Sequence, residues 1–351
     1  MGYSMFVSGL THVDEKRVWP GFMLYTPLSG SSYQLVDMKG NVVHEWAAPE
    51  GLITFYGTLL ENGNLLAKFI SGAELYGEQG GNAAVTQEID WDGNVVWEYL
   101  DTLTHHDHVR LANGNTIVSV SDVLDPDSAS KIQGGTPNTE ANDGTIRGER
   151  LKEISPEGEV VWEWRGYDSL DLSSDVIPPA RPRGVWLHCN AVEELPGGDL
   201  LVSFNTLSRL MIIDKSTGNI KWRLDRDITA SQHNPTMLAN GNILVFDNGA
   251  SRNQSRVIEI IPETQEIAWE YTGSPPDSFY SFNISGAQRL PNGNTLICEG
   301  RSGRMFEVTQ EHEIVWEFIN PLVVSRLGLP SRQVFRAYKY SSDSPEIKNR
   351  V

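Results

Sequence analysis

Five of the eight histidines in the chain lie shortly before a turn motif that recurs along the sequence. They occur in the segments HHDHVRLANGN, LHCNAVEELPGGD and QHNPTMLANGN, and are His105, His106, His108, His188 and His233. Near neutral pH an imidazole can act as a nucleophile, as a general acid or base, or as a metal ligand. If different repeats each place an imidazole at the same centre, these residues indicate a chemical site rather than isolated core histidines.

Counting back seven residues from the first residue of each turn aligns five positions. Four of them are polar within otherwise apolar segments: Phe55, His106, Asn190, His233 and Ser285 are the aligned residues. Because side chains alternate along a strand, we expect His108 to share a face with His106. For the same reason His188 shares a face with Asn190, and Cys189 points into the sheet, which argues against Cys189 as a nucleophile.

The elements that must position these histidines follow from a phrase that recurs six times. It reads DMKGNVVHEW at 37–46, DWDGNVVWEY at 90–99, SPEGEVVWEW at 155–164, DKSTGNIKW at 214–222, PETQEIAWEY at 262–271 and TQEHEIVWEF at 309–318. Each copy carries a Trp or His marker, at spacings of 53, 65, 60, 47 and 47 residues: His44, Trp97, Trp162, Trp222, Trp269 and Trp316. We expect these markers to pack one repeat against the next rather than to carry function.

A second phrase precedes copies two to six and consists of an apolar run, a turn that is usually Asn-Gly, and another apolar run. This is the pattern of a β-hairpin, and two further short strands complete each repeat. Four-stranded repeats without a helical period predict an all-β fold, a six-bladed β-propeller with four antiparallel strands per blade. The first repeat lacks an innermost strand, and we expect QVFRAYKYS at 333–341 to pair into the first blade and close the ring.

The whole chain, 1–351, is therefore predicted to form a single propeller domain. Its expected blades span approximately 20–48 with 333–341, 52–101, 104–166, 186–225, 231–273 and 281–320. Three stretches break the repeat and are expected to form long loops: 70–83, 123–149 and 165–185. Long loops inside a compact domain often act as lids over a functional site.

Composition excludes several classes of partner. With 28 Lys and Arg against 46 Asp and Glu, the formal net charge of −18 disfavours nucleic acid and anionic membranes. No apolar run reaches the length of about 18 residues that a transmembrane helix needs. The N-terminus lacks the basic start and long apolar stretch of a secretory signal. The sequence as it stands is expected to be cytoplasmic, or periplasmic if a signal peptide has been removed.

Several of these segments together resemble the PAPS-independent bacterial aryl sulfotransferase family. They are WDGNVVWEY, HHDH at 105–108, WLHCN at 186–190, QHNPTMLANGNILVFDNG at 232–249, GAQRLPNGNTLICEG at 286–300 and the final VWEFINP. The resemblance extends from about residue 20 to residue 340 and implies a six-bladed propeller with a funnel-shaped active site. It also implies a two-step reaction without a cofactor, in which a histidine takes a sulfuryl group from an aryl sulfate and passes it to a phenolic acceptor.

The resemblance assigns roles to four residues. His233 matches the nucleophile, and His106 and His188 match the histidines that handle the phenol proton and the sulfuryl oxygens. Asn190 matches a side-chain donor to developing negative charge. Seven further residues are expected to contact the substrate: Phe55, Tyr56, His108, Asn205, Arg301, Asp247 and Asn248. The last two end a strand near the same mouth and could orient the nucleophile, and the aromatic residues could stack on a planar ligand.

One position departs from the family pattern. Family members carry an arginine at the end of the second strand of the fourth blade, where this chain has Asn205. A guanidinium suits a planar array of anionic oxygens, so its absence weakens the case for a sulfate ester unless another cation replaces it. The candidate replacements are Arg289, Arg301, Arg304 and Lys68.

The residues also leave two alternatives open. A divalent metal held by His106, His108, His188 and His233 would make the protein a metal-dependent lyase or hydrolase acting on a small anionic or aromatic substrate. A non-catalytic propeller that binds a protein or a sugar is the second alternative, although a binding face does not need several imidazoles in its channel. Both enzymatic hypotheses expect a small-molecule partner.

Overall fold

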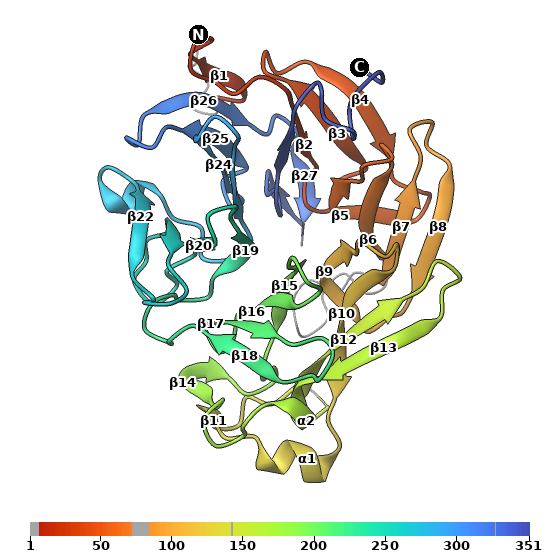
Figure 1. The fold of residues 1–351 in the computed structure, drawn as a ribbon, viewed down its shortest axis with the longest axis vertical. Helices are drawn as coiled ribbons and strands as arrows, with labels where there is room; N and C mark the ends of the chain where they lie inside the picture. Colours follow the sequence, from red (N-terminus) through yellow and green to blue (C-terminus); the bar gives the residue numbers. More distant parts are fainter. Residues whose placement is uncertain (1–6, 72–83, 142, 327) are drawn as a thin grey trace.

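Six antiparallel sheets set in a ring form the framework of the molecule (Figure 1). The computed structural model describes residues 7–71, 84–141, 143–326 and 328–351. Each sheet has four strands that lie side by side in order from the centre of the ring to its outer edge, and the sixth sheet has a fifth strand. The predicted all-β, six-bladed propeller is therefore confirmed. Within the described ranges, no helix has the length and apolar character needed to cross a membrane.

In the first three blades the strands follow one another from the inner edge of the ring outwards. Blade one consists of β29 (Tyr338–Tyr340), β2 (Phe22–Tyr25), β3 (Ser32–Asp37) and β4 (Val42–Ala47). Blade two consists of β5 (Leu52–Leu59), β6 (Leu65–Ser71), β7 (Val85–Ile89) and β8 (Val95–Leu100). Blade three consists of β9 (Thr104–Arg110), β10 (Thr116–Val123), β12 (Arg147–Ile154) and β13 (Val160–Arg165).

The last three blades keep the same inner-to-outer order. Blade four consists of β15 (Cys189–Glu194), β16 (Leu200–Phe204), β17 (Arg209–Ile213) and β18 (Ile220–Arg223). Blade five consists of β19 (His233–Met237), β20 (Ile243–Asp247), β21 (Arg256–Ile260) and β22 (Ile267–Thr272). Blade six consists of β23 (Gly286–Arg289), β24 (Thr295–Glu299), β25 (Arg304–Val308), β26 (Ile314–Ile319) and the added β1 (Gly9–Val13).

Both ends of the chain contribute to the seam between blades six and one. The C-terminal strand β29 pairs antiparallel with β2, with Phe22 opposite Tyr340, as the repeat pattern predicted. The pairing of β1 with the outer strand β26 was not predicted, because residues 9–13 are only partly buried and carry no clear apolar alternation. Strand β1 and the C-terminal end of the chain both lie at the top of Figure 1. The ring is thus closed at its inner edge by one terminus and covered at its outer edge by the other.

A buried ion pair holds the same seam together. Nζ of Lys339 on β29 donates to the Glu307 carboxylate on β25, and both side chains are fully buried. The same ammonium donates to the carbonyl of Trp19 at 3.2 Å, and Asn294 donates to the other carboxylate oxygen at 2.6 Å. The blade-six carboxylate is therefore satisfied by a cation from blade one.

The recurring Trp markers join successive blades, as expected. The indole Nε1–H of Trp222 donates to the carbonyl of Pro262 in the next blade at 2.9 Å, and Trp162 and Trp269 make the same type of contact. Trp316 completes the circle by donating to the carbonyl of Met38 in blade one at 2.9 Å. Trp97 differs, because its indole N–H has no hydrogen-bond partner among the described residues and its ring lies 5.3 Å from the Arg110 guanidinium of blade three. Apart from Trp97, the repeated marker is thus an inter-blade hydrogen-bond donor as well as an apolar surface.

The Asn-Gly turns are stabilised by a repeated carboxylate on the third strand of the blade. In blade two, Nδ2 of Asn62 and Nδ2 of Asn64 both donate to Glu88, at 3.0 Å and 2.7 Å. Gly63 between them has φ 84°, a conformation that glycine adopts without steric cost. Blades three and five repeat this arrangement with Glu153 and Glu259.

The two long insertions of blades three and four pair with each other. The first contains α1 (Pro126–Lys131) and β11 (Gly134–Thr136), and the second contains α2 (Gly166–Ser169) and β14 (Ile177–Pro182). Strands β11 and β14 form a small parallel sheet, and both insertions lie beside blade four at the bottom of Figure 1. The interruption expected at 70–83 lies, beyond its first two residues, outside the described residues. A hairpin of β27 (Val324–Arg326) and β28 (Leu329–Ser331) follows blade six, and η1 (Pro276–Ser278) follows blade five.

We predict that Lys339→Met lowers the free energy of unfolding by about 3 kcal/mol, because it leaves the Glu307 carboxylate buried without its cation. Denaturant unfolding measures the change. The double variant Lys339→Met/Glu307→Gln should recover most of the loss, and Lys39→Met, which alters an exposed lysine, should shift stability by less than about 0.5 kcal/mol. A single variant as stable as the wild type would contradict this role of the pair.

Candidate functional site

The inner strands do not run regularly, and their irregularities place the histidines. In blade three the pairing of β9 with β10 shifts between His105 and His108, so that His106 and Asp107 form a bulge. His106 has φ 41°, and His188 just before β15 has φ 59°, both in the left-handed region that non-glycine residues seldom adopt. Such strained conformations cost on the order of 1–3 kcal/mol each and concentrate at functional sites.

The bulge corrects one prediction of the sequence analysis. His106 and His108 were expected to share a face, but the two bulged residues in β9, with His106 in the left-handed region, break the alternation on which that expectation rests. The Nε2–H of His108 donates to the carbonyl of Leu66 at 3.2 Å, and its ring stacks on Tyr56 at 4.8 Å. These two residues line a pocket of about 280 Å³ on the inner channel that does not include His106 or His188.

His233 is held by an amide side chain from the neighbouring strand. Its Nδ1 lies 2.7 Å from Oδ1 of Asn248 and 3.1 Å from the carbonyl of Ser231, so Nδ1 carries the proton and donates. The Nδ2 group of Asn248 donates to the carbonyls of Ser281 and Ile284, which fixes the orientation of the amide. The Nε2 atom of His233 therefore keeps its lone pair. Burial is the main reason that the pKa of His233 falls to about 3.

Asp247, the other residue at the end of this strand that was proposed to orient His233, does not contact the imidazole. Asp247 accepts from the backbone N–H of Ala230 at 2.8 Å and pairs with the guanidinium groups of Arg252 and Arg256. It therefore stabilises the loop that leads into β19. Of the two residues suggested by the sequence, the structure brings only Asn248 into contact with the imidazole.

Two imidazoles from different blades meet at the mouth of the channel. The Nε2 atoms of His106 and His188 are 3.1 Å apart. Nδ1 of His106 lies 3.0 Å from Nδ1 of His105, whose Nε2 lies 2.9 Å from the Glu149 carboxyl group. Burial lowers the pKa of His188 and of His105 to about 3, and lowers that of His106 well below its usual value. All three rings are thus neutral at pH 7.

The C-terminal segment places two side chains in the centre of the ring that the sequence analysis did not assign to the site. The ring of Phe335 lies 4.4 Å from that of Phe55, 6.1 Å from His106 and 6.4 Å from His233. The guanidinium of Arg336 pairs with both oxygens of Asp107 at 3.1 Å and donates to the carbonyl of Asn190. The closing segment thus contacts the innermost segments of blades two, three, four and five.

Asn190 is also turned toward the backbone. Its Nδ2 donates to the carbonyl of Gln232 at 2.8 Å, and its side chain is fully buried. Its Oδ1 is buried without a hydrogen-bond partner among the described residues. The neighbouring Cys189 is fully buried, and burial raises the pKa of its thiol well above the usual range, which agrees with its exclusion as a nucleophile.

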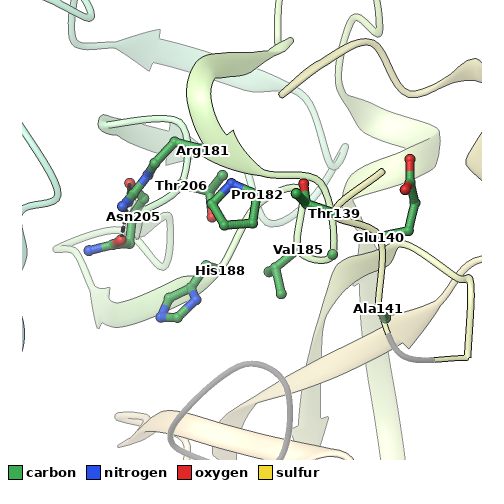
Figure 2. Close-up of a pocket in the computed structure, with 10 residues that line it drawn as sticks. Thr139, Glu140, Ala141, Arg181, Pro182, Val185, His188, Asn205 and Thr206 are labelled. Atoms are coloured by element: carbon green, nitrogen blue, oxygen red, sulfur yellow. Dashed lines mark hydrogen bonds between the residues drawn. The ribbon is translucent and has the colours of Figure 1, made fainter. Parts of the chain in front are cut away.

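A pocket of about 360 Å³ opens at the mouth beside His188 (Figure 2). The guanidinium of Arg181, on the inserted strand β14, donates to Oδ1 of Asn205 at 2.6 Å and to its carbonyl at 3.0 Å. The amide of Asn205 in turn donates to the carbonyl of Ser231 at 2.9 Å. Asn205, which stands where the resemblance implies an arginine, therefore holds an arginine that comes from the insertion.

The cations named by the sequence analysis lie elsewhere. Arg289 pairs with Glu259, and Arg304 pairs with Glu317, both on the blade surfaces. Nζ of Lys68 donates to the carbonyls of His105 and Asp107, so it supports the bulge of β9, and burial lowers its pKa to about 7. Arg301 stacks on Phe282 at the rim of blade six, 4.4 Å from the ring centre.

The four histidines considered as metal ligands do not converge. His108 lies on the inner channel with Tyr56, and His233 bonds to Asn248 through Nδ1, while only His106 and His188 touch. Among the described residues, no group of three or more His, Cys, Asp or Glu side chains is arranged to hold a metal ion. The four histidines predicted as alternative metal ligands thus lie in different parts of the ring.

Besides Phe335 and Arg336, two further residues of this site were missed by reasoning from the sequence: Arg181 and Glu149. Both lie at the ends of insertions that break the repeat, so counting from the turns could not align them. The only sequence signal was indirect: the missing arginine at Asn205, together with the two arginines of PPARPRG in the nearby insertion.

Comparison with protein families gives one match. The family model described as arylsulfotransferase (ASST) matches residues 84–321, which includes the histidine segments of blades three, four and five. Comparison with curated protein sequences found no match.

Solved structures share the architecture at low sequence identity. A protein of unknown function from Bacteroides caccae is 13% identical, with a TM-score of 0.58 over 91% of this chain and 98% of that chain. A streptogramin B lyase is 14% identical, with a TM-score of 0.51 over 89% of this chain and 82% of that chain. A catalytically inactive form of virginiamycin B lyase from Staphylococcus aureus, with quinupristin, is 12% identical, with a TM-score of 0.50 over 89% of this chain and 88% of that chain. Identities this low show a shared fold only.

The buried imidazole of His233 makes a specific prediction for stability against pH. Its pKa is about 3 in the folded protein and about 6.5 in the unfolded chain, so between these values only the unfolded chain takes up the proton. Stability is therefore lost as the pH falls, by about 2 kcal/mol between pH 7 and pH 5 for this residue.

Denaturant unfolding of the wild type and His233→Gln over this pH range isolates the effect, because every other buried group titrates in both proteins. The wild type should lose about 2 kcal/mol more than the variant. Parallel pH profiles would show that the pKa of His233 is not depressed.

Proposed function

The chain belongs to the arylsulfotransferase (ASST) family, and on that premise we propose that it transfers a sulfuryl group from an aryl sulfate to a phenolic acceptor through a sulfated His233. The observation that carries the proposal is the hydrogen bond from Nδ1–H of His233 to Oδ1 of Asn248, 2.7 Å long. It fixes the tautomer in which Nε2 is the nucleophile. The depressed pKa, about 3, keeps that nucleophile unprotonated at neutral pH.

Arg181 supports the choice of a sulfate ester. A guanidinium is always charged and offers a planar set of donors that match the oxygens of a sulfuryl group. Asn205 fixes one nitrogen of Arg181, and the guanidinium lines the pocket that also contains His188. In the proposed reaction Arg181 stabilises the charge on the equatorial oxygens as the sulfuryl group passes to and from His233.

His188 and His106 support proton handling at the phenolic oxygen. His188 is partly exposed to the pocket and bonds to His106 through Nε2, which leaves Nδ1 of His188 to face the substrate. A phenolic oxygen must gain a proton when the donor leaves and lose one when the acceptor attacks. Phe55 and Phe335, whose rings pack at 4.4 Å, offer an apolar surface beside His106 and His233 for the aromatic part of either substrate.

We predict that incubation with para-nitrophenyl sulfate adds the mass of one sulfuryl group to the protein and releases para-nitrophenol in a burst. Intact-mass spectrometry and absorbance measure the two products, and peptide mapping should locate the group on His233. His233→Gln should lose both signals, whereas His312→Gln, which changes a histidine on the outer edge of blade six, should retain both. A wild-type protein that forms neither product under these conditions contradicts the proposed function.

We predict that Arg181→Ala slows the sulfation of His233 by about 100-fold to 1,000-fold, the usual effect of removing one donor to a developing anionic charge. Rapid-mixing measurement of the burst tests this. Lys131→Ala, which removes an exposed cation from the neighbouring insertion, serves as the matched control and should keep the wild-type rate. An Arg181→Ala burst as fast as that of the control would assign the anionic oxygens to another residue.

A further inference from the structure

An unbroken chain of hydrogen bonds leads from the pocket to a buried carboxyl group. It runs from His188 to His106 at 3.1 Å, to His105 at 3.0 Å, and to Oε1 of Glu149 at 2.9 Å. Only His188 is partly exposed, and the side chains of His105 and Glu149 are fully buried. The second carboxyl oxygen, Oε2, accepts from the backbone N–H of Cys189 at 2.7 Å. The sulfuryl transfer proposed above leaves His105 and Glu149 without a role.

The bonding nitrogens along this chain allow two complete proton arrangements. In the first, Glu149 is ionised, and each imidazole donates toward it: His105 through Nε2–H, His106 through Nδ1–H and His188 through Nε2–H. In the second, Glu149 is protonated and every bond is reversed, which leaves the proton of His188 on Nδ1. Every imidazole is neutral in both arrangements. They differ by one proton, which enters at Nδ1 of His188 and is stored on Glu149.

We propose that His105 and Glu149 form a proton relay with His106 and His188, and that Glu149 is the proton store of the site. The inference rests on the proposed function, for which it supplies the source and the destination of the phenolic proton. The proposal rests on the linear order of the four groups. His105 and His106 each use both ring nitrogens in the chain, and His188 uses Nε2 in the chain and Nδ1 at the pocket.

The surroundings of the chain favour storage at the carboxyl end. Burial raises the pKa of Glu149 well above its usual value, while burial lowers the pKa of His105 and of His188 to about 3. Among the groups around Glu149, the Asp122 carboxylate favours the protonated form, whereas the backbone N–H of Cys189 and the Lys68 ammonium favour the ionised form. A proton in this chain therefore rests on oxygen rather than on an imidazole.

In the acceptor step, the phenolic oxygen forms a bond to sulfur as the bond from sulfur to Nε2 of His233 breaks, and its electron pair returns to that nitrogen. The phenolic proton passes to Nδ1 of His188. One proton moves along each bond of the chain, and Glu149 ends protonated. The donor step runs in reverse, so Glu149 returns the proton to the departing phenolate. A full cycle therefore consumes no proton and builds no imidazolium ion.

Glu149→Gln tests the relay. The amide can still accept from the N–H of Cys189, and its NH₂ group donates to His105, which locks the chain in the arrangement with Nδ1 of His188 protonated. Sulfation by para-nitrophenyl sulfate should keep its wild-type burst, because that leaving group is stable as an anion. Transfer from sulfated His233 to an unactivated phenol should slow by about 100-fold or more, since the proton has no destination.

Two further measurements keep the test decisive if that variant folds poorly. His105→Gln interrupts the chain of hydrogen bonds at another residue. It should likewise keep the burst and slow the transfer to the acceptor. Glu149→Asp should restore part of the acceptor rate. In the wild type alone, the acceptor rate should depend on the deuterium fraction of the solvent along a curve, because several protons move together. A linear dependence would exclude the concerted movement of several protons in the rate-limiting step.

The outcomes separate the relay from the proposed function. A wild type that is never sulfated overturns the proposed function and the catalytic relay with it. A wild type that is sulfated, with folded Glu149→Gln and His105→Gln variants that transfer to phenols at the wild-type rate, overturns the relay alone. Loss of the burst together with the acceptor step in these variants would assign Glu149 a purely structural role.

Discussion

The structure depends on the contact that each blade makes with the next. In five of the six blades an indole N–H on the outer strand donates to a backbone carbonyl of the following blade, and the last such bond, from Trp316 to Met38, joins the sixth blade to the first. In blade two the contact is the Trp97 ring packed against the Arg110 guanidinium of blade three. β29 completes the same junction at the inner edge by pairing with β2. A closed ring removes exposed strand edges and fixes the distance of every inner strand from the centre. Side chains from separate blades can therefore meet with defined geometry.

The centre of this ring is unusually polar for a buried region, and closure explains how it is tolerated. Arg336 enters with the closing segment, pairs with Asp107 and satisfies the carbonyl of Asn190. Lys68 satisfies two carbonyls that the bulge in β9 leaves without strand partners. Buried polar groups are stable when they are hydrogen-bonded. The remaining polar groups, the imidazoles, stay neutral because the same exclusion of water lowers their pKa values.

The architecture was readable from the sequence because it is periodic. Repeated turn and tryptophan motifs predicted the six blades, and the missing strand of the first repeat predicted closure by the C-terminus. His106 and His233 were found by alignment on the turns, and His188 by its place two residues before the aligned Asn190. Strand β1 was missed because residues 9–13 belong to no repeat.

Features that break the period were not predictable in this way. The position of His108 was wrong because a bulge changes the direction of a side chain without changing the spacing of the motif. Arg181 and Glu149 reach the site through contacts between segments far apart in the chain, which no count from a turn could place. The roles of these residues follow from their partners rather than from their positions.

The origin of Arg181 in an insertion has a consequence for how such a site can diversify. The framework of the ring comes from the repeats, whereas the guanidinium comes from strand β14. In the part of the chain that the structure describes, β14 pairs with the other insertion and with no blade strand. Gly134 permits that pairing, since a side chain there would collide with the carbonyl of Ile177. Substitutions in these two insertions can thus change the charge in the pocket beside His188 while leaving the blades and their histidines unchanged. The charge at the pocket and the folding of the ring are in this way determined by separate segments of one chain.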